Sequence, residues 1–306
     1  MIKKKLFIFP FIFCIIYYIK FYKIIKVCLC SIGKEENLYA REFVEHYKKI
    51  GVNKIFLYDN NNINGESFDI VLKDYIDQRF VEIIDIRGIS APQKKAIEDC
   101  RKKNFKKFDW LFFFDLDEFL FLRNYSNVKD FLNQKKFDKC QTIQLNWFFH
   151  TDNNLLYYDN RTLAERFPET DRRFKDKKIG GVEGIKSILR GNIDIEIYDI
   201  HKLNPNLTSC DGFGNITQID AISTNNADHY YYYIDHYWSK STEEFVKKLN
   251  KGSVTYGYWF EHLLKRIRIY FDLCDITAEK IDYIENKTKL NLSQYRSKIK
   301  SYNSNR

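Results

Sequence analysis

Residues 27–61 read VCLCSIGKEENLYAREFVEHYKKIGVNKIFLYDNN, and this stretch changes its periodicity twice. The run VCLCSI (27–32) is apolar and has the length of a strand. Apolar residues then recur at helical spacing, at Ala40, Phe43, Val44 and Tyr47. The run KIFLYD (54–59) is again apolar and short. The stretch therefore predicts a strand, a helix and a second strand.

The same alternation continues as far as residue 114. Helices are expected over 67–76 and 92–105, and strands over 80–86 and 109–114. Successive strand–helix units favour parallel pairing, because the crossover helices cover both faces of the sheet. We expect an α/β fold of the open, mostly parallel type, flanked by helices. No glycine-rich dinucleotide motif or P-loop follows any of these strands.

Composition excludes several functional classes. The chain has 306 residues, of which 44% are hydrophobic, so it can bury the core of one α/β domain with extensions. Its 50 basic and 41 acidic residues are mixed along the sequence, which argues against a nucleic-acid partner. The seven cysteines form no CxxC pair and have no zinc-site spacing. We interpret Cys28 and Cys30 as small core residues of the first strand.

The N-terminal segment is apolar. Residues 6–19 carry no charge and lie between lysine-rich flanks. We expect residues 1–25 to be a membrane anchor, or an apolar leader that packs on the domain. The anchor predicts a single-pass membrane protein, whose domain faces the Golgi or ER lumen if the source is eukaryotic. Six N-x-S/T sequons are compatible with that location.

Three acids interrupt the apolar run FFFDLDEFLF (112–121). Asp115, Asp117 and Glu118 come directly after a predicted buried strand, at the edge where parallel sheets bind ligands. Carboxylates held this close repel one another unless a cation lies between them, and oxygen ligands favour Mg²⁺ or Mn²⁺. The sequence predicts a metal–diphosphate site. The alternative is a structural one, in which Asp115 caps a turn and Asp117 is solvated.

Three blocks of the sequence occur in this order: KEENLYAREFVEHYKKIGVNKIFLYDNN, FFFDLDEFLF and HYWSKSTEEFVKKLNKG. Together they resemble glycosyltransferase family 92 and related enzymes of the GT-A fold. The resemblance implies a GT-A domain over 26–257 and an inverting, metal-dependent transferase that uses a nucleotide-sugar. Asp115 and Asp117 match the family's DxD motif, and His236 matches the histidine of its late block.

Further site residues are expected from their positions. Asp59 ends the second strand and is expected to contact the base or ribose of the donor, or to form a turn with Asn60. His236 is expected to be a third metal ligand, or a packing residue. Lys186 and Arg190 are candidate phosphate ligands, or members of a solvated strand face.

We expect Glu183 to be the general base that deprotonates the acceptor hydroxyl. Glu165 and Asp211 also qualify for this role by their positions after the acidic turn.

The function predicted is transfer of a sugar, from a UDP-linked donor, to a glycan, glycoprotein or glycolipid acceptor, with Mn²⁺ or Mg²⁺ as cofactor. The first alternative is a non-catalytic carbohydrate-binding or scaffold protein on the same fold. A phosphatase with a strand-end DxD and a two-metal nuclease fit less well. Residues 258–306 are expected to form a helical extension that packs on the domain or contacts a membrane surface.

Overall fold

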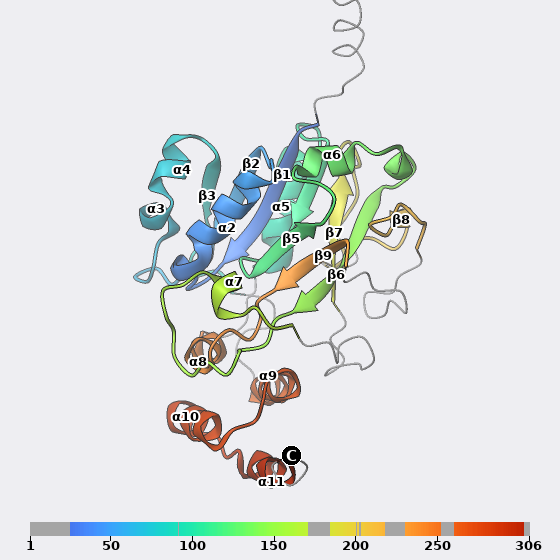
Figure 1. Cartoon of the computed structure of the whole chain (residues 1–306). Helices are drawn as coiled ribbons and strands as arrows, with labels where there is room; N and C mark the ends of the chain where they lie inside the picture. Colours follow the sequence, from blue (N-terminus) through green and yellow to red (C-terminus); the bar gives the residue numbers. More distant parts are fainter. Residues whose placement is uncertain are drawn as a thin grey trace, which may run out of the picture.

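The computed structural model describes residues 25–90, 92–170, 184–199, 201, 203–217, 230–251 and 260–302. Within this part of the chain, nine strands form one sheet with helices on both faces (Figure 1). The predicted α/β class is confirmed. The strand order is β3-β2-β1-β4-β7-β6-β9-β5, and β8 pairs with β6 outside this path.

The first half of the sheet is parallel. Its strands are β1 (Val27–Gly33), β2 (Lys54–Asp59), β3 (Val81–Asp85) and β4 (Trp110–Phe113). β1 pairs with β2 and β4, and β2 pairs with β3, all in parallel register. The connecting helices are α2 (Asn37–Lys49), α3 (Phe68–Val71), α4 (Lys73–Asp77) and α5 (Gln93–Asn104). This order follows the alternation read from the sequence.

The second half of the sheet is mixed. Its strands are β5 (Glu118–Leu122), β6 (Thr142–Phe149), β7 (Ile185–Arg190), β8 (Ser209–Cys210) and β9 (Tyr232–His236). β7 runs antiparallel to both β4 and β6, and β5 runs antiparallel to β9. The prediction of a mostly parallel sheet therefore holds for the first half of the sheet only. The remaining segments of this region are α6 (Val128–Leu132), the 3₁₀ turn η1 (Lys135–Phe137) and α7 (Leu163–Arg166).

The core has two layers, one on each side of β1. Alternating β1 residues point to opposite faces, so Leu29 packs in the larger cluster and Cys30 in the smaller one. α2 contributes Phe43 and Val44 to the first cluster, and α5 contributes Ile97 to the second. Because both faces of β1 are covered, its burial is continuous from Val27 to Gly33.

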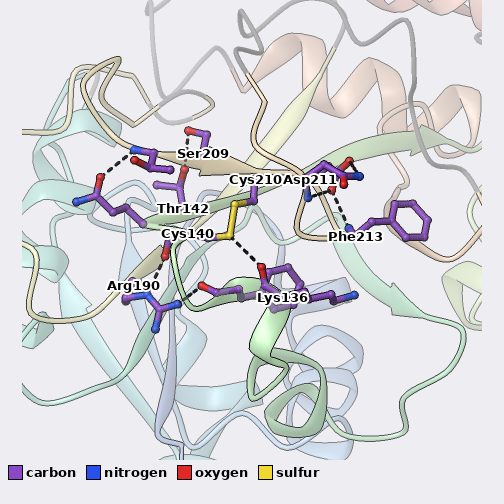
Figure 2. The surroundings of a disulfide bond; sticks show 12 residues. Lys136, Cys140, Thr142, Arg190, Ser209, Cys210, Asp211 and Phe213 are labelled. Carbon is purple, nitrogen blue, oxygen red and sulfur yellow. Dashed lines mark hydrogen bonds between the residues drawn. A yellow bond between two sulfur atoms is a disulfide. The ribbon is translucent and has the colours of Figure 1, made fainter.

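Two disulfides join distant parts of the fold. Cys30 in β1 is bonded to Cys100 in α5, so the interpretation of Cys30 as a simple core residue is wrong. Cys140 is bonded to Cys210 of β8 at the rim of the sheet (Figure 2). In each bridge the two cysteines are 70 residues apart in the sequence. A search for short cysteine motifs cannot detect pairs at this separation. Cys28 is buried and free, as expected of a core residue.

Four helices lie at the end of the sheet toward which β1 points (Figure 1). They are α8 (Thr242–Asn250), α9 (Phe260–Leu273), α10 (Ala278–Thr288) and α11 (Ser293–Tyr302). A buried polar network connects them to the domain: Lys280 Nζ lies 2.6 Å from Asp152 Oδ2, and the Tyr270 hydroxyl donates to the same oxygen. The described part of the C-terminal region is helical.

The prediction of a single-pass membrane protein is corrected. None of the helices in the described ranges is long and apolar enough to cross a bilayer. The expected anchor, residues 1–25, lies almost wholly outside the described residues, which begin at Ile25.

Candidate active site

The acidic residues lie in the turn between β4 and β5, at the carboxyl edge of the parallel strands. Glu118 closes this turn, because its Oε2 accepts a hydrogen bond from the Asp115 backbone at 2.9 Å. Leu116 points into the core and packs closely on Gly33 at the end of β1, where an added Cβ would lie 2.3 Å from Leu116 Cδ1. Asp117 and Glu118 are buried, so Asp117 is not the solvated side chain of the structural alternative.

His236, the last residue of β9, completes the acidic cluster. Its register partner on β5 is Glu118. His236 Nε2 lies 3.5 Å from Asp117 Oδ1 and 4.0 Å from Glu118 Oε1. One ligand atom from each of these three side chains can be chosen so that all lie within 4.8 Å of one another. We call Asp117, Glu118 and His236 the acidic trio.

The chemistry of the acidic trio fits a divalent cation. Two carboxylates and an imidazole are ligands that Mn²⁺ accepts readily. Glu118 Oε1 and His236 Nδ1 are buried and lack a hydrogen-bond partner among the described residues. Buried polar atoms are normally paired, so the unpaired carboxylate oxygen leaves ligand capacity at this point. The predicted metal set of Asp115, Asp117 and His236 shares two members with the acidic trio.

Asp115 has a different partner. Lys186, on β7, places its ammonium 2.7 Å from Asp115 Oδ2 and 3.3 Å from Glu118 Oε2. Gln93, the first residue of α5, donates to Asp115 Oδ1 at 3.4 Å. Lys186 thus lies among the acids and is buried, so it is not part of a solvated strand face. Arg190, at the other end of the same strand, bonds the carbonyls of Phe137 and Cys140 instead, so the structure does not bring it to the site.

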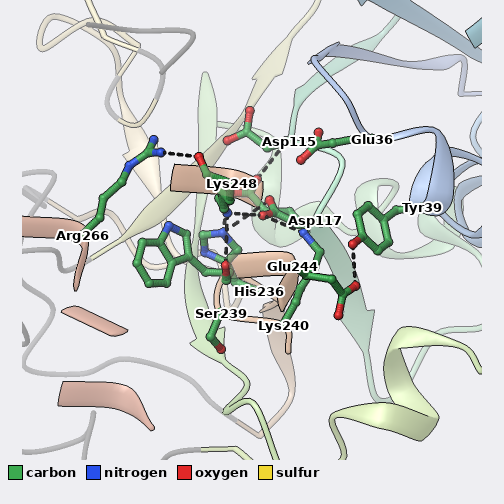
Figure 3. A network of polar contacts seen from close by, with 12 residues as sticks. Glu36, Tyr39, Asp115, Asp117, His236, Ser239, Lys240, Glu244, Lys248 and Arg266 are labelled. Carbon is green, nitrogen blue, oxygen red and sulfur yellow. Dashed lines mark hydrogen bonds and ion pairs between the residues drawn. The ribbon is translucent and has the colours of Figure 1, made fainter. Parts of the chain in front are cut away.

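Two further lysines reach Asp117 (Figure 3). Lys248 Nζ, on α8, lies 2.7 Å from Asp117 Oδ2, and Lys240 Nζ lies 3.5 Å from the same oxygen. Both lysines are largely shielded from solvent. Our sequence analysis missed them, although both lie in the block HYWSKSTEEFVKKLNKG. They were missed because a lysine in an amphipathic helix is normally assigned to the solvated face. The signal that could have identified them is their position in a block that also contains His236.

The electrostatics of the two adjacent carboxylates differ. Burial would raise the pKa of Asp117, but Lys248, Lys240 and His236 outweigh burial and hold this pKa well below its usual value. Burial raises the pKa of Glu118 well above its usual value, with Lys186 opposing this effect. Burial also lowers the pKa of His236 to about 4. Asp117 is therefore charged and His236 neutral near pH 7, as metal ligation requires, whereas Glu118 holds a proton more tightly than a free glutamate and must release it when a cation binds.

Asp59 occupies the end of β2, at the same edge of the sheet. Its side chain is fully buried, and its Oδ1 accepts a hydrogen bond from the Asn61 backbone at 2.9 Å. Arg87 Nε lies 3.3 Å from Asp59 Oδ2. The turn expected of this residue is therefore formed, with Asn61 as the partner, and Arg87 is an additional cation beside it.

The base candidates fall into two groups. Glu165 forms a capping box with Thr162 at the start of α7. Asp211 accepts hydrogen bonds from the backbones of Phe213 and Asn215 in a turn. Both acids therefore have structural partners of their own. Glu183 lies outside the described residues.

An acidic trio at the carboxyl edge of a mixed α/β sheet, surrounded by buried lysines, defines a candidate site for a metal and an anionic ligand. The sequence profile of glycosyltransferase family 92 matches residues 23–256. The chain belongs to this family, which confirms the resemblance.

Curated relatives are plant proteins of the same family. One from Ricinus communis is 27% identical over 105 residues, which cover 34% of this chain and 19% of the relative. One from Oryza sativa subsp. japonica is 26% identical over 107 residues, which cover 35% of this chain and 18% of the relative. The matched segments thus span about a fifth of the length of these relatives.

Solved structures show weaker similarity. Staphylococcus aureus TarS 1-349 in complex with UDP is 13% identical, with a TM-score of 0.40, over 86% of this chain and 70% of that one. The mannosyltransferase PcManGT from Pyrobaculum calidifontis, in complex with GDP-Man and Mn²⁺, is 8% identical, with a TM-score of 0.32. The match covers 41% of this chain and 36% of the mannosyltransferase. At this level of similarity, neither structure locates a ligand on this chain.

Proposed function

We propose that this chain transfers a sugar from a nucleotide-sugar, UDP-linked, to a hydroxyl group of a glycan, glycoprotein or glycolipid, with inversion at the anomeric carbon. The catalytic unit is the GT-A domain of residues 26–257, and residues 258–306 support it. One observation carries the proposal: the buried acidic trio, with an unpaired Glu118 oxygen, in a chain that belongs to glycosyltransferase family 92.

The acidic trio would hold Mn²⁺ or Mg²⁺. When bound, such an ion neutralises charge on the donor's diphosphate. Asp117 and Glu118 supply carboxylate oxygens, and His236 supplies an imidazole nitrogen. Lys186 keeps Asp115 beside them, where this carboxylate can accept hydrogen bonds from the donor. Asp59 is buried at the same edge and is our candidate for contact with the nucleoside, supported by the cation Arg87.

In the proposed displacement, the acceptor oxygen forms a bond to the anomeric carbon while the bond from that carbon to the phosphate oxygen breaks. The acceptor proton passes to a general base. We retain Glu183 for this role because it is an acidic residue that follows the acidic turn in the sequence, in GGVEGIKSI. Its conservative variant, Glu183→Gln, should leave donor binding intact and abolish transfer.

The test is acceptor-dependent release of nucleoside diphosphate. The purified chain is incubated with Mn²⁺, a panel of nucleotide-sugars and hydroxyl acceptors, with and without EDTA. We expect release from a UDP-sugar that EDTA abolishes, and a product whose anomeric configuration, read by NMR, is opposite to that of the donor. Donor binding without turnover on any acceptor would instead support the scaffold alternative.

A further inference from the structure

Asp117 has more positive charge beside it than it can neutralise. The ammonium groups of Lys240 and Lys248 both approach the same atom, Asp117 Oδ2. Asp115 and Glu118 share one cation, Lys186, and Lys251 lies 3.0 Å from Glu36, so these two lysines have acceptors other than Asp117. A buried ion costs several kcal/mol unless it is paired. Two ammonium groups converge on one oxygen of Asp117, and their remaining N–H donors can bind a further anion.

Lys240 is the less well paired of the two. Its side chain is 5% exposed, although lysine is almost never fully buried without a partner. Apart from the 3.5 Å contact with Asp117, its ammonium lies 4.3 Å from the centre of the Tyr39 ring. Its backbone has a φ of 53°, in the left-handed region that side chains other than glycine disfavour. Backbone strain of this kind is typical of functional sites.

Lys248 is held in place from both sides. Its ammonium donates to the Trp238 carbonyl at 3.2 Å as well as to Asp117, and these two bonds leave one of its three N–H groups for another acceptor. Its own carbonyl accepts a hydrogen bond from Arg266 of α9 at 3.2 Å (Figure 3). The C-terminal helices therefore help to fix the position of α8 and its lysine.

We propose that Lys240 and Lys248 bind the diphosphate of the donor and stabilise the negative charge that leaves with it. The inference rests on the proposed function and assigns two further residues to the same site. As the bond between the anomeric carbon and the phosphate oxygen breaks, its electron pair stays on the phosphate. The two lysines keep their protons and act as fixed positive charges at that oxygen. Their contact with Asp117 places them beside any ligand that meets the acidic trio.

Titration calorimetry of the full chain tests this assignment. UDP, UMP and uridine are each added in the presence of EDTA and then with Mn²⁺, and GDP is tested in parallel. We expect the wild-type chain to bind UDP without metal, more weakly at high salt. Lys240→Met and Lys248→Met should each weaken UDP binding by about 10- to 100-fold, because each removes a charge-assisted hydrogen bond. Uridine binding should be unchanged.

The matched control is Lys247→Met on the same helix. Lys247 is 61% exposed and pairs with Glu243, so its loss should leave UDP binding unchanged. Lys248→Arg keeps the charge and should retain most of the affinity. If Lys248→Met does not fold, as judged by its melting temperature, Lys240→Met decides the question.

The outcomes separate two failures. Wild-type binding of UDP combined with unchanged affinity in both methionine variants would overturn the lysine assignment alone. A wild-type chain that binds no nucleoside diphosphate, with or without Mn²⁺, would overturn the proposed donor and the lysine assignment together.

Discussion

Lys248 and Asp117 are 131 residues apart in the sequence, yet the lysine Nζ lies 2.7 Å from the aspartate Oδ2. This contact joins α8 to the turn that follows β4, so the charge of the site is set by two distant segments of the chain. Because of this contact, removal of the Asp117 charge should destabilise the fold. Repulsion from Asp115 is offset by lysines, and loss of the Asp117 charge would leave two buried cations without their shared partner.

Removing Lys280 should strongly destabilise the fold. This lysine and Asp152 form a buried pair with Nζ and Oδ2 2.6 Å apart. In Lys280→Met the carboxylate of Asp152 stays buried without a cation, and we expect the free energy of unfolding to fall by about 3–5 kcal/mol. Urea denaturation measures this change. The control is Lys287→Met on the exposed side of α10, which should change the free energy by less than about 0.5 kcal/mol. Equal effects from both variants would show that the buried pair is not formed.

Breaking the Cys140–Cys210 bridge should also destabilise the fold. The bridge closes a sequence separation of 70 residues, for which the chain-entropy relation gives about 4 kcal/mol. We expect the double variant Cys140→Ser with Cys210→Ser to lose stability by this order in denaturant titrations. Mass spectrometry of unreduced proteolytic peptides provides the control, because it should detect the linked pair in the wild-type chain. Absence of linked peptides, together with an unchanged denaturation midpoint, would contradict the bridge.

Acid should destabilise the protein partly through His46. This side chain packs against Phe119, and its Nε2–H donates to the Leu120 carbonyl at 3.1 Å. Burial lowers the pKa of His46 to about 4. The unfolded chain, with a histidine pKa of about 6.5, binds more protons than the folded chain between these values. The stabilising effect of the neutral imidazole is therefore complete above about pH 6.5 and is lost as the pH falls toward 4.

We expect this effect to contribute about 2 kcal/mol between pH 7 and pH 5. His46→Gln keeps a hydrogen-bond donor but does not titrate, so urea denaturation of this variant should show a smaller loss over the same interval. Part of the loss should remain, because burial also lowers the pKa values of His201 and His236. Identical pH profiles for wild type and variant would exclude His46 as a source.

The sequence predicted the parallel half of the sheet because its signals are local. Apolar runs and helical spacing in residues 27–114 reflect how each segment packs, and the three acids are placed by the strand directly before them. The antiparallel strands were not predicted, because the pairing of β7 with β4 and β6 depends on contacts between remote segments. The lysines around Asp117 were missed for the same reason.

The central claim is that Asp117 holds a divalent cation at the donor's diphosphate. The most direct measurement is Mn²⁺-dependent release of nucleoside diphosphate by wild type and Asp117→Asn, with Asp159→Asn as a control, because Asp159 is paired with Arg161 and belongs to no part of the acidic trio. We predict that Asp117→Asn loses turnover by about 100-fold or more, while Asp159→Asn keeps it. Near-normal turnover in a folded Asp117→Asn protein would contradict the account.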